Sequence, residues 1–96
     1  MNAQTISTFF PEFNATDLKG TQPQRLQAIR NRLIDEAHWI NGLLPASQNT
    51  NDAMTTLGHT WYSVNVAIRG ESDHEAHREF RGGATGSTEQ TAGAGR

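Results

Sequence analysis

The sequence has no cysteine among its 96 residues. This absence excludes a disulfide framework, a thiolate zinc site and a cysteine nucleophile. No apolar run approaches the roughly 18–20 residues that span a bilayer, so we expect no membrane segment. The first five residues carry neither the basic start nor the apolar stretch of a signal peptide. We therefore expect the protein to be made and kept in a cytosol-like compartment.

Charged and apolar side chains are also scarce. Eight Lys and Arg residues against ten Asp and Glu residues give a net charge of −2, which offers little attraction to nucleic acid or to an acidic lipid surface. Hydrophobic residues make up 34% of the chain, which is below the roughly 45–50% usual in globular chains, even allowing for that figure counting glycine. The length allows one domain. Part of this domain therefore either does not pack or packs against another molecule.

The shortage of apolar residues is greatest in residues 82–96. This segment holds five of the nine glycines and no large apolar side chain. Burial therefore cannot offset an ordering entropy of about 1–2 kcal/mol per residue. We expect a helical domain over residues 1–81 and a flexible Gly/Thr-rich arm over residues 82–96, which would need a partner to become ordered.

Apolar residues spaced three or four apart predict a first long helix over Pro23–Asn41. Thr21 is a suitable N-cap, Pro23 lies in the first turn, and Gly42 stands where the helix should end. The stripe consists of Leu26, Ile29, Leu33, Ala37, Ile40 and Leu44, and Ile34 and Trp39 widen it.

A second long helix is predicted over Asp52–Arg69, with Asn51 or Asp52 as its N-cap and Gly70 at its end. The β-branched and aromatic residues 61–66 could also alternate as a strand, but the length and the flanking caps favour a helix. The apolar stripe consists of Ala53, Leu57, Trp61, Val64 and Ile68, with Met54 beside it.

A short helix is expected after the second long one. Ser72 and Glu75 have the spacing of a capping box, and the helix that they open should reach about Phe80. The sequence thus predicts an all-α fold, in which two long helices and short flanking helices form a small bundle, followed by an extended C-terminal tail.

Three of the four phenylalanines lie close together near the N-terminus, at Phe9, Phe10 and Phe13. Thr5 or Ser7 can cap a single helical turn that runs through Phe9 and Phe10. We expect the three aromatic rings to be structural anchors that hold the N-terminal segment against the helix pair.

Histidine and carboxylate residues are the only candidates for a catalytic or metal site. His74 and His77 are three residues apart, whereas a zinc-protease helix needs a spacing of four. His59 and Glu79 could in principle complete a site, but no third ligand is indicated locally. A solvated helix face is the favoured interpretation, and a metal-dependent activity is the weakest alternative.

Adjacent carboxylates at Asp35 and Glu36 point in different directions on a helix, so they cannot act as a paired acid and base. Arg32 precedes them by three and four residues, which predicts ordinary helical ion pairs. The serine, histidine and aspartate residues lack the strand-turn-helix context of a nucleophile. We expect no enzymatic activity and no cofactor.

Arg25, Arg30 and Arg32 make DNA binding an option. Arg25 and Arg32 are seven residues apart, so they share a helix face and can contact phosphates. Against this, the sequence has one lysine and a net negative charge. The connection over residues 42–51 is also longer than the tight turn that precedes a recognition helix. A small helical DNA-binding or regulatory protein is therefore the alternative.

The aromatic residues Trp39, Trp61 and Tyr62 have two interpretations. Such residues are most often core, but two helices with short flanks have limited room for them. Some of this surface can therefore face another subunit, because aromatics and arginine are favoured at interface centres. Core and contact roles both remain open for these residues.

The phenylalanine cluster also carries a resemblance to a known family. The segment Thr8-Phe9-Phe10-Pro11-Glu12-Phe13, a polar turn with Asp17 and a long aliphatic-alanine helix resemble the start of small head–tail adaptor proteins of tailed phages. These are also called head completion or connector proteins. Leu57-Gly58-His59 and the residues up to Ile68 look like the second helix of that family. The resemblance covers residues 5–70, and its specific part is the Phe-Pro-Glu-Phe segment.

The resemblance implies an all-α subunit that forms a homo-oligomeric ring, typically of twelve copies, beneath the portal protein of a phage capsid. Such a ring extends the channel through which genomic DNA passes without sequence-specific binding, and it presents a platform to tail or neck proteins. It implies location in the virion neck, and in the host cytoplasm during assembly. A C-terminal extension commonly docks on the portal in this family, and residues 82–96 correspond to it by position only.

Contacts with partners or neighbouring subunits are expected from residues on the first two long helices and in the arm. These residues are Arg25, Arg32, Trp39, Trp61, Gly82, Gly83, Thr85, Thr88 and Arg96.

Overall fold

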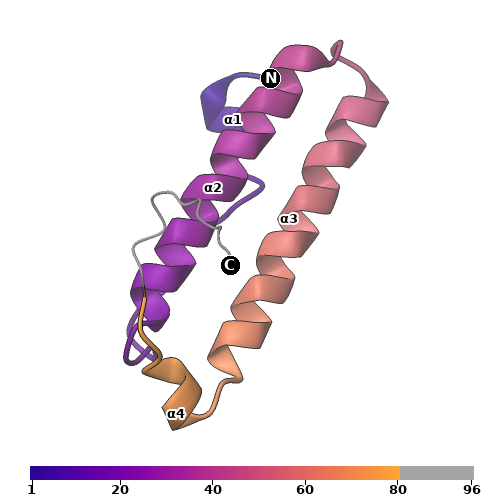
Figure 1. The fold of residues 1–96 in the computed structure, drawn as a ribbon. Coiled ribbons are helices and arrows are strands. Elements are labelled where there is room, and N and C mark those ends of the chain that lie inside the picture. Colours follow the sequence, from indigo (N-terminus) through magenta and orange to yellow (C-terminus); the bar gives the residue numbers. More distant parts are fainter. Residues whose placement is uncertain (81–96) are drawn as a thin grey trace, which may run out of the picture.

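The computed structural model describes residues 1–80, and within them it contains four helices and no strand. Two long helices, α2 (Gln22–Leu43) and α3 (Gln48–Arg69), run antiparallel and side by side (Figure 1). The short helices α1 (Ala3–Ser7) and α4 (Asp73–Ala76) lie toward opposite ends of this hairpin. The predicted all-α fold with two long and several short helices is confirmed.

Helix α2 begins one residue earlier and ends two residues later than predicted. Gly42 lies inside the helix, because Leu44 is the residue that leaves helical geometry, with φ −114° and ψ 146°. This extended conformation follows from Pro45, whose ring disfavours the α region for the residue before it. The proline therefore ends the helix, and the expectation that Gly42 would do so was wrong.

Helix α3 begins four residues before the predicted start at Asp52. Ser47 is its N-cap and accepts a hydrogen bond from the backbone N–H of Thr50 at 3.3 Å, so the prediction that Asn51 or Asp52 caps the helix was wrong. The early start leaves a short connection between α2 and α3, in place of the longer predicted one. The other end, with Gly70 as C-cap, lies where the sequence placed it.

Helix α4 has the predicted capping box, with Ser72 and Glu75 each accepting from the backbone of the other. It ends at Ala76 and so falls short of the predicted Phe80. The carbonyl oxygen of Ala76 instead accepts from the backbone N–H of Thr21 at 2.8 Å and from its hydroxyl at 3.2 Å. The end of α4 is thus joined to the start of α2.

Helix α1 is capped by Asn2, whose side chain accepts from the backbone N–H of Thr5 at 2.8 Å. The prediction that Thr5 or Ser7 would cap this turn was therefore wrong. The helix ends at Ser7, so Phe9 and Phe10 follow it in a turn and are not part of it.

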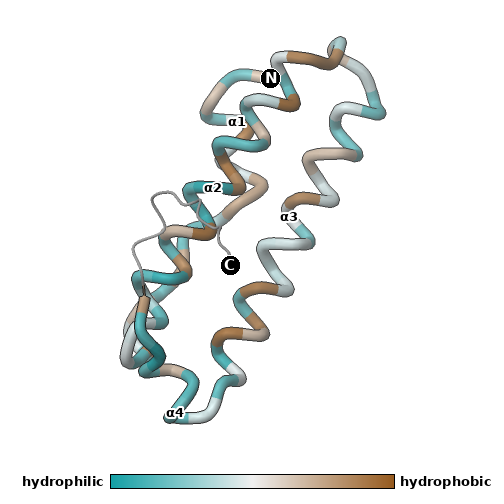
Figure 2. The backbone as a smooth tube through the Cα atoms, viewed as in Figure 1, coloured by the Kyte–Doolittle hydropathy of each residue, from teal (hydrophilic) through white to brown (hydrophobic). Residues whose placement is uncertain are grey.

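The segment after α1 crosses one face of the hairpin and is tied to both long helices (Figure 1). The Arg30 Nε of α2 donates to the carbonyl oxygen of Phe10 at 2.7 Å. The Trp61 Nε1 of α3 donates to the carbonyl oxygen of Pro11 at 2.8 Å. Figure 2 shows that hydrophobic residues recur along both long helices. The buried core consists of Ile6, Phe10, Leu26, Ala37, Met54, Trp61 and Ile68.

The three N-terminal phenylalanines lie between the N-terminal segment and the helix pair. Phe10 is completely buried, and Phe9 and Phe13 are partly buried against the core. The ring of Phe13 meets Trp61 edge-on, with centroids 6.2 Å apart. The backbone of Phe9 comes so close to α3 that a Cβ on Gly58 would lie 2.9 Å from its carbonyl oxygen. Close backbone approach at Gly58 therefore allows the segment to lie flat on the hairpin.

The turn before α2 depends on Gly20, the residue with φ 56°. A Cβ at this position would lie 2.2 Å from the carbonyl oxygen of Ala76. We expect Gly20→Ala to lower the free energy of unfolding by about 1–3 kcal/mol, because it adds left-handed strain and a clash with α4. Urea unfolding followed by circular dichroism measures this change.

Gly42→Ala is the matched control for this measurement. A Cβ at Gly42 meets open space inside a regular helix. The free energy of unfolding of this variant should therefore rise by about 0.5–1 kcal/mol. Equal effects of the two substitutions would contradict the role assigned to Gly20.

Candidate functional site

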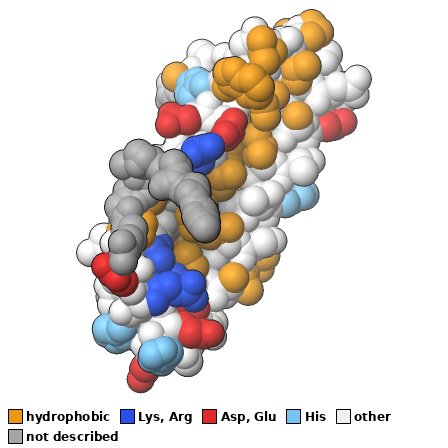
Figure 3. All heavy atoms as spheres, in the orientation of Figure 1, with side chains coloured by type: hydrophobic (Ala, Val, Ile, Leu, Met, Phe, Trp, Pro, Cys, Tyr) orange, Lys and Arg blue, Asp and Glu red, His pale blue; other side chains and the backbone are white. Residues whose placement is uncertain are grey.

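The two faces of the α2–α3 hairpin differ in what covers them. The N-terminal segment covers one face, and the other holds a groove of about 550 Å³ between the two helices. Figure 3 shows hydrophobic side chains in a band along this second face, with charged side chains gathered toward the α4 end. We call this surface the open face. The groove is lined by Arg25, Ala28, Ile29, Val64, Ala67, Ile68, Glu71, Arg78 and Phe80.

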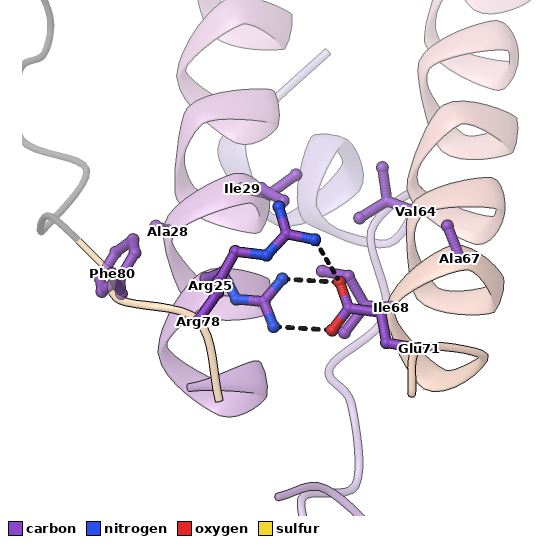
Figure 4. Close-up of a pocket in the computed structure, with 9 residues that line it drawn as sticks. All are labelled: Arg25, Ala28, Ile29, Val64, Ala67, Ile68, Glu71, Arg78 and Phe80. Carbon is purple, nitrogen blue, oxygen red and sulfur yellow. Dashed lines mark hydrogen bonds and ion pairs between the residues drawn. The ribbon is translucent and has the colours of Figure 1, made fainter. Parts of the chain in front are cut away.

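One end of the groove is closed by a buried ion pair between α2 and the segment after α3 (Figure 4). Arg25 Nη1 and Nη2 donate to the two carboxylate oxygens of Glu71 at 2.8 and 2.7 Å. The side chains of Arg25 and Glu71 are only 12% and 11% exposed. Arg78 adds a longer contact of 3.4 Å to the same carboxylate. Bidentate geometry of this kind fixes the orientation of both groups as well as their separation.

Neighbouring polar groups complete the end of the groove. Gln22 is almost completely buried, and its Nε2 donates to the carbonyl oxygen of Ile68 at 2.7 Å. The same atom lies 3.4 Å from Glu71 Oε1. A buried amide of this kind avoids the cost of an unpaired polar group. Gln22 therefore connects the start of α2 to the end of α3.

The ion pair changes the protonation of both of its members. Hydrogen bonding from Arg25 lowers the pKa of Glu71 from 4.5 to about 2, against the opposing effect of burial. Hydrogen bonding to Glu71 raises the pKa of Arg25. Both groups are therefore charged at neutral pH, and the pair acts as a fixed structural element of the groove.

The other end of the open face exposes large apolar side chains. Trp39 is 64% exposed and Leu43 is 66% exposed. Trp39 follows Ala28 by three helical turns, and Leu43 follows Arg25 by five, so both lie on the groove side of α2. Leu44, at the C-cap of α2, is also exposed. The open face thus carries a groove near α4 and an apolar projection near the α2–α3 turn.

A second exposed apolar surface lies on α3. Tyr62 is 70% exposed and Val66 is 55% exposed. Tyr62 lines a hollow together with Pro11 and Glu12, which belong to the N-terminal segment. This surface therefore lies on the side of the molecule opposite the open face.

The structure places the expected contact residues in different environments. Trp39 is exposed, and Arg32 is 75% exposed and pairs with Glu36 at 3.2 Å, as the helical spacing predicts. Trp61 is only 2% exposed. The expectation that Trp61 contacts a partner is corrected, because its ring fills the core of the single chain. Arg25 is committed to Glu71. The other expected contacts, Gly82, Gly83, Thr85, Thr88 and Arg96, lie outside the described residues, as does the predicted arm.

The three arginines that made DNA binding the alternative are engaged within the chain. Arg25 pairs with Glu71, Arg30 with the Phe10 carbonyl, and Arg32 with Glu36. The remaining basic side chains of residues 1–80 also have partners: Lys19 with Asp73, Arg69 with Asp17, and Arg78 with Glu71.

The expected contacts omitted Glu71 and Arg78. Glu71 meets Arg25 across 46 positions of sequence. No local spacing rule relates residues so far apart, since helical pairing reaches only three or four positions. The one available signal was a carboxylate directly after the glycine that ends a helix.

The histidines and the helices of residues 1–80 show neither a metal site nor a membrane span. In this part of the chain, no group of three or more His, Asp or Glu side chains is arranged to hold a metal ion. His77 Nδ1 lies 2.8 Å from the carbonyl oxygen of Asp73, so one of the two ring nitrogens of His77 is already hydrogen-bonded within the chain. None of the helices in the same part has the length and hydropathy needed to cross a bilayer.

Comparisons with protein-family models, with curated proteins and with solved structures found no match to the chain. Within residues 1–80, the protein is a helical hairpin with one face covered by its own N-terminal segment and one open face.

The Arg25–Glu71 pair predicts a pH dependence of stability. The Glu71 pKa is lower in the folded chain than its ordinary value of 4.5, so the stabilisation is complete above pH 4.5 and is lost as the pH falls toward 2. We expect a loss of about 1–2 kcal/mol, since solvent at the groove mouth screens the pair. Urea unfolding at pH 7 and at pH 2.5 measures it.

Glu71→Gln provides the comparison. It removes the charge at the same volume, so its unfolding free energy should be lower than that of the parent at pH 7 and should change less between the two pH values. An unchanged pH dependence in this variant would show that another group is responsible.

Proposed function

We propose that the protein is a structural head–tail adaptor of a tailed phage. In this role it forms a homo-oligomeric ring, typically of twelve copies, between the portal protein and the tail or neck proteins. It acts without catalysis or a cofactor, in the virion neck after assembly in the host cytoplasm. The resemblance of the Phe-Pro-Glu-Phe segment suggested this role, and the geometry supports it in two ways.

The observation that carries the proposal is the exposure of apolar side chains on two different sides of the hairpin. Trp39 and Leu43 lie on the open face, and Tyr62 and Val66 lie on the opposite side of the molecule. A subunit with two different contact surfaces can have a neighbour on each side. Head-to-tail contacts of this kind generate rings when the rotation between neighbours closes.

The pairing of the basic side chains supports the second part of the proposed role. A protein that lines a DNA channel must let the phosphate backbone slide. A cation whose charge is balanced by a neighbouring carboxylate displaces fewer counterions from DNA, so it binds DNA weakly. The carboxylate partners of Arg25 and Arg32 thus favour a passive channel wall over a DNA-reading surface.

In this proposal, residues 82–96 dock on the portal, because they correspond by position to the C-terminal extension of the adaptor family. A polar arm that becomes ordered on binding exchanges its conformational entropy for a long contact surface. Within this proposal the contacts are made by Gly82, Gly83, Thr85, Thr88 and Arg96.

Electron microscopy of the protein mixed with the portal ring of the same phage tests the proposal. We expect a second ring of density stacked on the portal. Tyr62→Glu should abolish this ring, because a charge replaces an apolar contact. Ser63→Glu adds the same charge at the next exposed position and should leave the ring intact.

A protein that ignores the portal, or a ring that forms equally well with Tyr62→Glu, would contradict the proposal. Circular dichroism of both variants confirms in advance that the helical fold is retained, since both side chains are exposed.

A further inference from the structure

We infer that the open face is a contact surface for a second copy of this chain, related by a two-fold axis. In this pair, Trp39 of each copy enters the groove of the other. The inference goes beyond the proposed function, because it concerns the protein before any portal is present. The two-fold contact occupies the open face in the free protein and must open before that face contacts a neighbour in a ring. Four features of the open face carry the inference.

The first feature is that the apolar projection and the groove lie on one face. Trp39 stands 11 residues after Ala28, which lines the groove, and this separation corresponds to about 16 Å along α2. A two-fold axis between the two positions brings both projections to both grooves at once. Because each copy supplies the same projection and the same groove, the contact closes on itself.

The second feature is the chemistry of the groove. Its walls are apolar side chains from α2 and α3, including Ile29 and Val64 (Figure 4). Arg78 lies at its rim with a side chain that is 56% exposed. An indole ring buries a large apolar area and packs well against a guanidinium group. Trp39 is therefore suited to the groove in both shape and charge.

The third feature is charge complementarity along α2. If Trp39 of one copy is placed opposite Ile29 of the other, the two-fold axis passes through position 34 of both helices. Arg32 then faces Glu36 of the second copy, and Glu36 faces its Arg32. These residues already pair within one helix at 3.2 Å. In the dimer the four side chains form an alternating network, which is worth more than an isolated surface pair.

The fourth feature is the available area. Two adjacent helices of 22 residues each present a face of roughly 33 by 20 Å, or about 650 Å². A standard interface buries about 800 Å² per partner. The open face therefore has nearly the area that a stable dimer needs, and a net charge of −2 per chain opposes association only weakly.

Sedimentation equilibrium of the full chain tests this contact. We expect a species of twice the chain mass of 10.6 kDa, with a dissociation constant that Trp39→Ala raises about 30-fold or more, as for other aromatic hot spots. His38→Ala is the matched control. It removes a ring from the neighbouring exposed position of α2, about 100° away around the helix, and should leave the dissociation constant unchanged.

Charge exchange gives a second test that does not depend on removing a large side chain. Arg32→Glu and Glu36→Arg should each weaken the dimer, because each places like charges opposite one another across the axis. An equal mixture of the two variants should form a mixed dimer, and the double variant Arg32→Glu/Glu36→Arg should restore the dimer of the parent chain. Mass spectrometry of the intact complexes identifies the mixed pair.

A chain that stays monomeric at all concentrations would overturn the inference, whatever else covers the open face. The inference would also fail if Trp39→Ala left the dissociation constant unchanged, or if Arg32→Glu and Glu36→Arg did not associate with each other. The portal experiment instead measures a ring that depends on Tyr62. A chain that stays monomeric in solution but forms this ring on the portal would overturn the two-fold contact and leave the proposed function standing.

Discussion

The buried ion pair between Arg25 and Glu71 is the interaction on which the arrangement of the open face depends. It joins the first turn of α2 to the second residue after α3, at the end of the hairpin opposite the α2–α3 turn. Desolvating two charges is costly, and only the bidentate geometry and the added contacts from Gln22 and Arg78 offset that cost. Because the pair fixes how α2 and α3 meet, it also fixes the width of the groove.

Local signals predicted the parts of the fold that depend on nearby residues. The three- and four-residue spacing from Leu26 to Ala37 identified α2, and the Ser72–Glu75 capping box marked α4. The predicted ends were less accurate. Several residues can cap a helix in isolation, and the choice of Ser47 over Asn51 depends on where the chain must turn. The carbonyl of Ala76, held by Thr21, similarly ends α4 through a contact that no local pattern contains.

The site was predicted only in part, for the same physical reason. Exposure of Trp39 and burial of Trp61 are opposite outcomes for two aromatic residues with similar helical settings. What separates them is the N-terminal segment, which covers the α3 face and offers the Pro11 carbonyl to the Trp61 indole. The sequence shows that such a segment exists and is rich in phenylalanine, but it does not show which face that segment covers. The Arg25–Glu71 contact was beyond sequence reasoning because it joins residues 46 positions apart.

The distribution of apolar residues links this fold to assembly. A chain of this length buries only about 60% of the surface that its unfolded form exposes, so a large part of its apolar surface stays in contact with water. Within residues 1–80, that surface forms two patches. The open face keeps an apolar groove and the exposed Trp39 and Leu43, and the opposite side exposes Tyr62 and Val66. Each patch is a surface that gains stability when another chain covers it. In the assembly that we propose, neighbouring chains would cover the apolar surface that each chain leaves exposed, and this would compensate for a hydrophobic content of only 34%.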